Sequence, residues 1–331
     1  MKKQWITRVL LLVLAAGVIA GVSVLAKEHR AGKSAGSWKQ SSEKGLRGST
    51  TSTKKRRKNK KKNSKRRKAM YRGFVTDKVL HSKKYGSIHY NVYIPDSYDG
   101  TGRYALYVTL PGYQGLYFQG AAQNLKTEDF GFEAQKYNEK MIIVAPQLDD
   151  WGQTSADQTI ALTEYFLKHY KIDSSRVYIN GYSGGGETLS LVLGKRPELF
   201  AAALMCSSQW DGAYKPVVKA KTPVYFVIGE SDEYYGSAPF KKAYQTLYAL
   251  YEKQGLSQKA IDQLLVLDVK GKDYFEGTPV TYQHGGGYLF CRDKQIMGWL
   301  FQHRQDGYSV YDQRRLAGAR HQGYEGEMPG G

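Results

Sequence analysis

Cysteine is almost missing from this chain, which has only Cys206 and Cys291 among its 331 residues. Two cysteines are too few for a disulfide scaffold or for a four-cysteine metal site. We expect two buried free thiols. A single disulfide between them remains an alternative if the folded part works outside the cell.

Net charge is missing from most of the chain, although the whole sequence carries +19. Residues 1–72 hold 22 Lys and Arg against two acids, whereas the remainder holds 27 basic and 28 acidic residues, a net of −1. The basicity therefore describes the N-terminal part of the chain. It does not indicate what the rest of the protein binds.

Residues 1–26 have the layout of an export signal. Lys2, Lys3 and Arg8 precede residues 9–26, an apolar run without a charge. Such a run is typical of a signal peptide, and it is also long enough to remain in the membrane as a signal anchor. Retention is slightly favoured, and either outcome predicts an extracytoplasmic protein, membrane-anchored or secreted.

Residues 27–72 are poor in apolar side chains and rich in Lys, Arg, Ser and Gly, so we expect a disordered polybasic tether. Residues 54–68 contain 12 basic residues in 15. This basic run fits anionic lipid, an anionic wall polymer or nucleic acid as a partner, or simply a solvated spacer. Nucleic acid is disfavoured, because no aromatic side chains interleave the run to stack on bases.

After residue 72 the pattern changes to short β-rich runs that alternate with helical periodicity. Strands are predicted at 73–80, 87–94, 104–110, 141–145, 177–180, 201–206 and 224–228, and helices at 157–170, 187–193, 241–253 and 294–302. This order indicates the α/β class, with a mostly parallel sheet covered by helices on both faces. We therefore expect one monomeric folded domain over 73–331, with a flexible tail from about 304. Its ligand site should lie at the carboxyl ends of the strands.

A candidate nucleophile lies at one of these strand ends. Ser183 is the centre of Gly181-Tyr182-Ser183-Gly184-Gly185, between the predicted strand ending at Asn180 and the helix over 187–193. A sharp strand-to-helix turn projects such a serine above the sheet, and small neighbours let the strained backbone pass. The alternative is a glycine-rich loop whose serine only caps the helix.

A serine hydroxyl needs a base, and in this fold the acid and the histidine follow the serine along the chain. His284, His303 and His321 follow Ser183. His284 is favoured because it opens a glycine-rich loop before the last helix, whereas the other two are expected at the surface.

For the acid, Asp232 is favoured because it directly follows the apolar strand at 224–228. Its carboxylate would hold the histidine in the productive tautomer. Glu230, Glu233 and Asp211 are its rivals at the same sheet edge.

The loop at 111–115 follows the strand at 104–110 and is the candidate oxyanion loop. The amides of Tyr113 and Gly184 are the predicted donors to the developing negative oxygen. Gln114, Trp151, Tyr182 and Trp210 are predicted to line the substrate pocket, although core packing explains the tryptophans nearly as well.

The run 172–186, IDSSRVYINGYSGGG, resembles the nucleophile region of polyhydroxybutyrate-depolymerase-like and of feruloyl and acetyl-xylan esterases, and 228–232 with 284–301 resembles prolyl-oligopeptidase-type hydrolases. The resemblance implies the α/β-hydrolase fold, an acyl-enzyme on Ser183, and no metal or organic cofactor. One departure is Leu110-Pro111-Gly112, which lacks the His-Gly often found there and leaves the second oxyanion donor open.

The expected function is a serine carboxylic-ester hydrolase that acts on small acyl, feruloyl or acetyl esters, free or linked to a polymer. Two alternatives stay open. One is a serine peptidase of the aminopeptidase or oligopeptidase type, and the other is a non-catalytic surface protein that binds polyanions through residues 54–68.

Overall fold

The computed structural model describes residues 69–305 and 324–325. The predicted export signal at 1–26 and the basic run at 54–68 lie outside the described residues. Within the described part of the chain, no helix combines the length and the apolar character that crossing a membrane requires.

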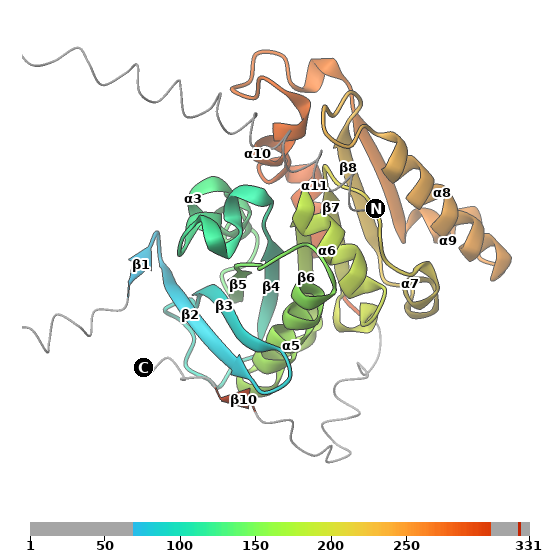
Figure 1. Ribbon diagram of the computed structural model, residues 1–331. Helices are drawn as coiled ribbons and strands as arrows, with labels where there is room; N and C mark the ends of the chain where they lie inside the picture. The colour runs from blue at the N-terminus through green and yellow to red at the C-terminus, as the bar shows by residue number, and fades with distance from the viewer. Residues whose placement is uncertain (1–68, 306–323, 326–331) are drawn as a thin grey trace, which may run out of the picture. The chain divides into compact units, whose positions relative to one another are not determined.

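A mixed β-sheet forms the centre of the molecule (Figure 1). Its strands are β1 (Met70–Tyr71), β2 (Phe74–Ser82), β3 (Gly86–Tyr93), β4 (Tyr104–Leu110), β5 (Met141–Pro146), β6 (Ile172–Tyr182), β7 (Ala202–Cys206), β8 (Val224–Gly229), β9 (Leu265–Lys270) and β10 (Tyr324–Glu325). The order across the sheet is β1-β2-β3-β5-β4-β6-β7-β8-β9, and β10 pairs with β2. Strands β4 to β9 run parallel to one another, whereas β1, β2, β3 and β10 are antiparallel to their partners.

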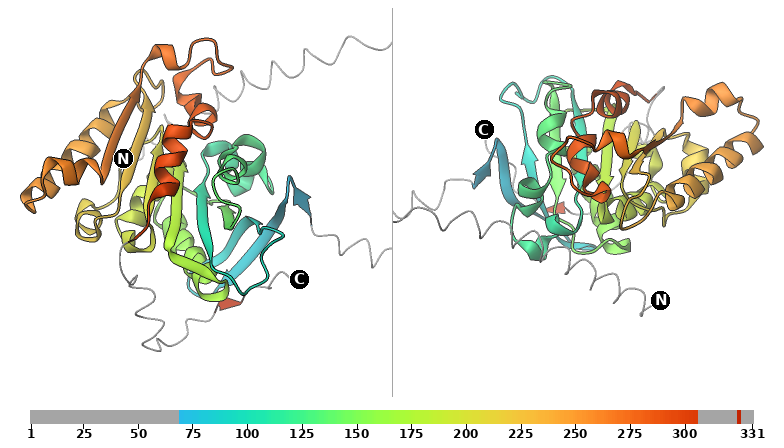
Figure 2. Two further views of the ribbon diagram at one scale, coloured as in Figure 1. Left: turned by 180° about the vertical axis from the view of Figure 1, so that it is seen from behind. Right: turned by 90° about the horizontal axis from the view of Figure 1, so that it is seen from above.

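Helices cover both faces of this sheet, which confirms the predicted α/β-hydrolase architecture. One face carries α5 (Gln153–His169), α6 (Gly184–Leu193), α7 (Tyr214–Ala220), α8 (Ala238–Lys253) and α9 (Gln258–Asp262), and the other carries α3 (Gln123–Thr127), α4 (Phe130–Ala134), α10 (Gly287–Phe290) and α11 (Lys294–Gln302). The view from behind in Figure 2 shows α11 across the second face.

The two cores follow from the alternation of side chains along the strands. In β4, Leu106 and Val108 point into the core beneath α5 and α6, while Ala105 and Tyr107 point into the core beneath α11. A strand that is buried on both faces has a continuous apolar sequence in place of an alternating one. This holds for β4, because all seven of its residues are buried.

The cysteines lie in the core of the second face. Cys206 ends β7 and Cys291 follows α10, and both are buried free thiols. Burial raises the pKa of Cys291 to about 12, so this thiol stays protonated at neutral pH.

Candidate active site

Ser183 occupies the turn between β6 and α6, at the carboxyl edge of the sheet. Its backbone has φ 54° and ψ −127°, a strained conformation for a residue other than glycine. Two neighbouring glycines make the turn possible. A Cβ on Gly181 would lie 2.4 Å from the Gly185 carbonyl oxygen, and one on Gly185 would lie 2.4 Å from the Leu110 carbonyl oxygen.

Contacts to the next strand hold the backbone of Ser183 in place. Its amide N–H donates to the Cys206 carbonyl oxygen at 3.0 Å, and its carbonyl oxygen accepts the Ser208 hydroxyl at 2.6 Å. These bonds satisfy both backbone groups, so the strained turn is fixed from the side of β7.

The structure brings Ser183, His284 and Asp232 together. The Ser183 Oγ lies 3.0 Å from His284 Nε2, and His284 Nδ1 lies 2.9 Å from Asp232 Oδ2. His284 belongs to the short 3-10 helix η5 (Gln283–Gly286), and Asp232 follows β8. The three residues therefore have the nucleophile, base and orienting-acid geometry of a serine hydrolase.

Asp232 is prepared to remain ionised although its side chain is fully buried. Burial pushes the pKa of Asp232 upward. The hydrogen bond and charge interaction with His284 and the amide N–H groups of Tyr235 and Tyr234 outweigh burial, and the pKa is lowered overall. An ionised carboxylate at this position favours the tautomer of His284 that carries its proton on Nδ1.

The segment that carries His284 is held by hydrogen bonds to its backbone. The Glu233 carboxylate accepts the amide N–H groups of Gln283 and His284, each at 2.9 Å. The Tyr182 hydroxyl donates to the His284 carbonyl oxygen at 2.7 Å, so the residue before Ser183 also holds the segment that carries His284.

The predicted oxyanion loop lies directly against the nucleophile. A Cβ on Gly112 would lie 3.1 Å from the Ser183 Cβ. Tyr113 is the first residue of η1 (Tyr113–Gly115) and Gly184 is the first residue of α6. Amides at the first position of a helix have no acceptor within that helix, so both are suited to donate to a ligand.

Comparisons with protein families and with solved structures relate this chain to known proteins. Residues 148–211, which include the nucleophile turn, match the model of the prolyl oligopeptidase family. A solved structure described as a thermostable esterase is similar, with 21% sequence identity and a TM-score of 0.57 over 70% of this chain and 64% of the esterase. By fold, the chain is an α/β-hydrolase. No curated protein matches the sequence.

Two further solved structures are more distant from this α/β-hydrolase. A lipase/esterase from Lactobacillus plantarum has 15% identity and a TM-score of 0.46, over 68% of this chain and 99% of that protein. Oligopeptidase B from Leishmania major has 12% identity and a TM-score of 0.41, over 69% of this chain but only 36% of the oligopeptidase.

The predicted pocket residues of the hydrolase lie in different surroundings. Trp151 covers Gly184 so closely that a Cβ there would lie 2.1 Å from the indole, and the Tyr113 ring lies 6.0 Å from Trp151. Gln114 is exposed on η1. Trp210 packs against Tyr214 at 5.3 Å, and its indole N–H donates to the Gly212 carbonyl.

Several residues around the site were not singled out by sequence reasoning. Tyr235 donates its hydroxyl to Glu187 at 2.6 Å, interacts with the Ser183 side chain and packs its ring beside His284. Glu128 accepts the Gly112 amide at 2.7 Å. Glu128 lies more than 50 residues from Ser183 in the sequence and has no motif around it, so only the folded chain reveals these contacts.

The two remaining rivals of Asp232, Glu230 and Asp211, are both exposed. Among the described residues, no group of three or more His, Cys, Asp or Glu side chains is placed to hold a metal ion.

Proposed function

We propose that this α/β-hydrolase is a serine carboxylic-ester hydrolase that works through an acyl-enzyme. The observation that carries the proposal is the continuous hydrogen-bonded path from Ser183 through His284 to the buried Asp232. A hydroxyl this close to an imidazole whose other nitrogen faces a carboxylate is an activated nucleophile.

In the proposed reaction, Ser183 Oγ attacks the ester carbonyl carbon while His284 Nε2 accepts its proton. The tetrahedral intermediate carries its negative charge on the former carbonyl oxygen, which the amides of Gly184 and Tyr113 would stabilise by about 3 kcal/mol each. The carbon–oxygen bond to the alcohol then breaks as His284 returns the proton to the leaving oxygen. Water repeats the sequence on the acyl-enzyme, releasing the acid and free Ser183.

The aromatic side chains beside the nucleophile support an apolar or aromatic acyl group. Tyr113 lies between Trp151, at 6.0 Å, and Phe118, at 5.6 Å, and Phe118 is 66% exposed. This series of aromatic side chains, from Trp151 over Gly184 to the exposed ring of Phe118, fits acyl groups from acetyl to feruloyl, including those attached to a polymer.

The test is covalent labelling of Ser183 by a fluorophosphonate probe. Wild-type protein should be labelled, and Ser183→Ala should lose the label and reduce ester turnover by roughly 10⁴-fold or more. Equal labelling of Ser183→Ala, or an unlabelled wild type, would contradict the proposal.

A serine peptidase is the second candidate, because the prolyl oligopeptidase family model matches residues 148–211. The same triad would serve it, and Glu187 lies beside Tyr235 near the nucleophile, where a carboxylate suits a substrate ammonium group. Turnover of acetyl, butyryl and feruloyl esters beside aminoacyl anilides separates the two. Faster cleavage of the anilides would favour the peptidase.

A further inference from the structure

The amide of Gly112, the residue of the oxyanion loop nearest to the nucleophile, is already engaged. Gly112 N–H donates to Glu128 Oε1 at 2.7 Å, whereas the Gly112 carbonyl oxygen accepts Gly115 N–H at 3.0 Å. The two peptide planes that meet at Gly112 are therefore both fixed by hydrogen bonds. Since the N–H of a trans peptide points opposite to its C=O, the bond to Gly115 also sets the direction of the Tyr113 N–H.

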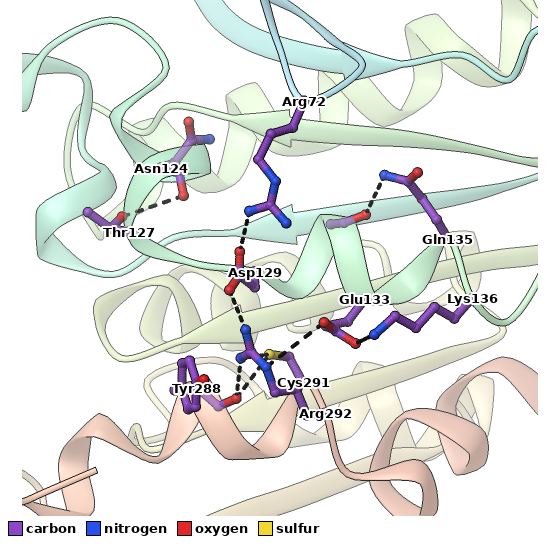
Figure 3. Close-up of polar contacts among 11 residues, drawn as sticks. Arg72, Asn124, Thr127, Asp129, Glu133, Gln135, Lys136, Tyr288, Cys291 and Arg292 are labelled. Atoms are coloured by element: carbon purple, nitrogen blue, oxygen red, sulfur yellow. Dashed lines mark hydrogen bonds and ion pairs between the residues drawn. The ribbon is translucent and has the colours of Figure 1, made fainter. Parts of the chain in front are cut away.

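Glu128 is itself held by its neighbour in the sequence. Asp129 accepts one arginine from each side, Arg72 at 2.8 Å and Arg292 (Figure 3). Arg292 also contacts Glu133 and lies over the Tyr288 ring at 3.7 Å. This arginine clamp ties the 128–133 segment to the segment that follows α10 and so restrains the backbone from which the Glu128 side chain extends.

We propose that Glu128 is a positioning residue for the oxyanion loop, whose carboxyl holds the Gly112 amide so that the Tyr113 N–H remains directed at the acyl oxygen. The inference rests on the proposed function, because it concerns the transition state of the same site. In the loop from Pro111 to Tyr113, the Gly112 amide is occupied by Glu128, and the Tyr113 amide is the donor to the substrate.

The protonation state of Glu128 matters to this role. Burial raises the pKa of Glu128 to about 8, against the opposing effect of the Gly112 hydrogen bond, so the group is neutral at pH 7. A neutral carboxyl still accepts the amide through its carbonyl oxygen. An ionised one places a negative charge one hydrogen bond away from the loop that must stabilise a negative oxygen.

The titratable groups that face Glu128 do not change charge in this pH range. They are Tyr107 of β4, Tyr182 of β6, Cys206 of β7, and Cys291 beside α10, with Asp129 next in the chain. Burial holds the pKa values of both tyrosines and of Cys206 well above their usual range and raises that of Cys291 to about 12. For Asp129, burial raises the pKa, but the bonds to the two arginines outweigh it, and that carboxylate stays ionised.

The experiment compares Glu128→Ala, which removes the acceptor, with Glu128→Gln, which keeps an acceptor that cannot ionise. Turnover of p-nitrophenyl acetate from pH 6 to 9.5 should show kcat about 10- to 100-fold lower in Glu128→Ala, with KM within about threefold of wild type. Glu128→Gln should keep kcat within about threefold at pH 7. In wild type, kcat should fall above pH 8 as Glu128 ionises, and Glu128→Gln should lack this fall. Glu139→Gln, at an exposed acid before β5, is the matched control and should behave as wild type.

Two further readouts keep the outcome decisive. Amide hydrogen exchange in the 110–117 peptide should be faster in Glu128→Ala than in wild type, whether or not the substrate is an ester. Unchanged exchange overturns the positioning role, as does a kcat of Glu128→Ala within twofold of wild type. If Glu128→Ala fails to fold, a fall of kcat above pH 8 that persists in Glu128→Gln overturns the positioning role instead.

Fluorophosphonate labelling of wild type separates this failure from that of the proposed function. If wild type is labelled and Glu128→Ala is unaffected, only the role of Glu128 is lost.

Discussion

The nucleophile turn and the histidine segment reach the same point by different physical means. Ser183 lies between two regular elements, and its position is set by backbones that approach too closely for any side chain at Gly181 or Gly185. His284 lies on a short 3-10 turn. Its position is set by two backbone hydrogen bonds, because its N–H donates to Glu233 and its carbonyl oxygen accepts the Tyr182 hydroxyl. The first region should therefore fail through lost stability, and the second through lost activity.

The largest effect is expected where the histidine segment meets its acid. Asp232→Asn keeps the size of the side chain but favours the wrong tautomer of His284, so kcat should fall by about 10³- to 10⁴-fold. The pKa of Asp232 is lower in the folded protein than in the unfolded chain, where it is about 4. Ionised Asp232 therefore stabilises the fold when the pH is above the unfolded pKa, and this contribution is lost as the pH falls through the folded pKa. Melts of both proteins should differ at pH 7 and converge at strongly acidic pH. A kcat within tenfold of wild type would show that Asp232 does not orient His284 for catalysis.

The next effect tests the nucleophile turn. Gly185→Ala should lower the free energy of unfolding by about 3 kcal/mol, since its Cβ would meet the Leu110 carbonyl oxygen. The matched control is Gly271→Ala, which has φ −70° and no atom within 4 Å of the added Cβ. Denaturant unfolding measures both variants. Equal stabilities would show that backbone approach does not set the turn.

The smallest effect concerns the bonds of the histidine segment alone. Glu233→Ala should lower kcat by about 10-fold with little change in melting temperature, because the two amides that Glu233 accepts become free to bond water and the imidazole loses its fixed position. Glu230→Ala, which removes the exposed neighbouring acid, is the control. A drop in melting temperature that matched the drop in kcat would indicate general unfolding instead.

Much of the fold was predictable because its elements are strongly patterned. β4 and α11 have the bounds that their apolar runs predict, and the other predicted strands were found within a few residues, apart from β6, which begins five residues earlier. β9 was missed, because Leu265–Lys270 is a half-buried edge strand that contains Asp268 and ends in Lys270. β10 falls in the stretch that the sequence predicts to be a flexible tail.

The site was predictable only where chain order limits the choice. Ser183, Asp232 and His284 follow the order that the fold imposes, and the structure brings these three together. Glu128 and Tyr235 were not predictable, because their roles depend on which loops meet across the sheet edge. No spacing in the sequence encodes the approach of Glu128 to Gly112.

The arginine clamp closes a ring around the site. Starting from Ser183, the path runs through His284 along the chain to Arg292, across to Asp129 and Glu128, and through Gly112 back against the nucleophile. When one contact in this closed series is lost, the remaining contacts still link all of its members. Substitutions at two of its members should therefore cost more together than the sum of their separate costs, so sequence change in this enzyme is expected to be epistatic around the ring.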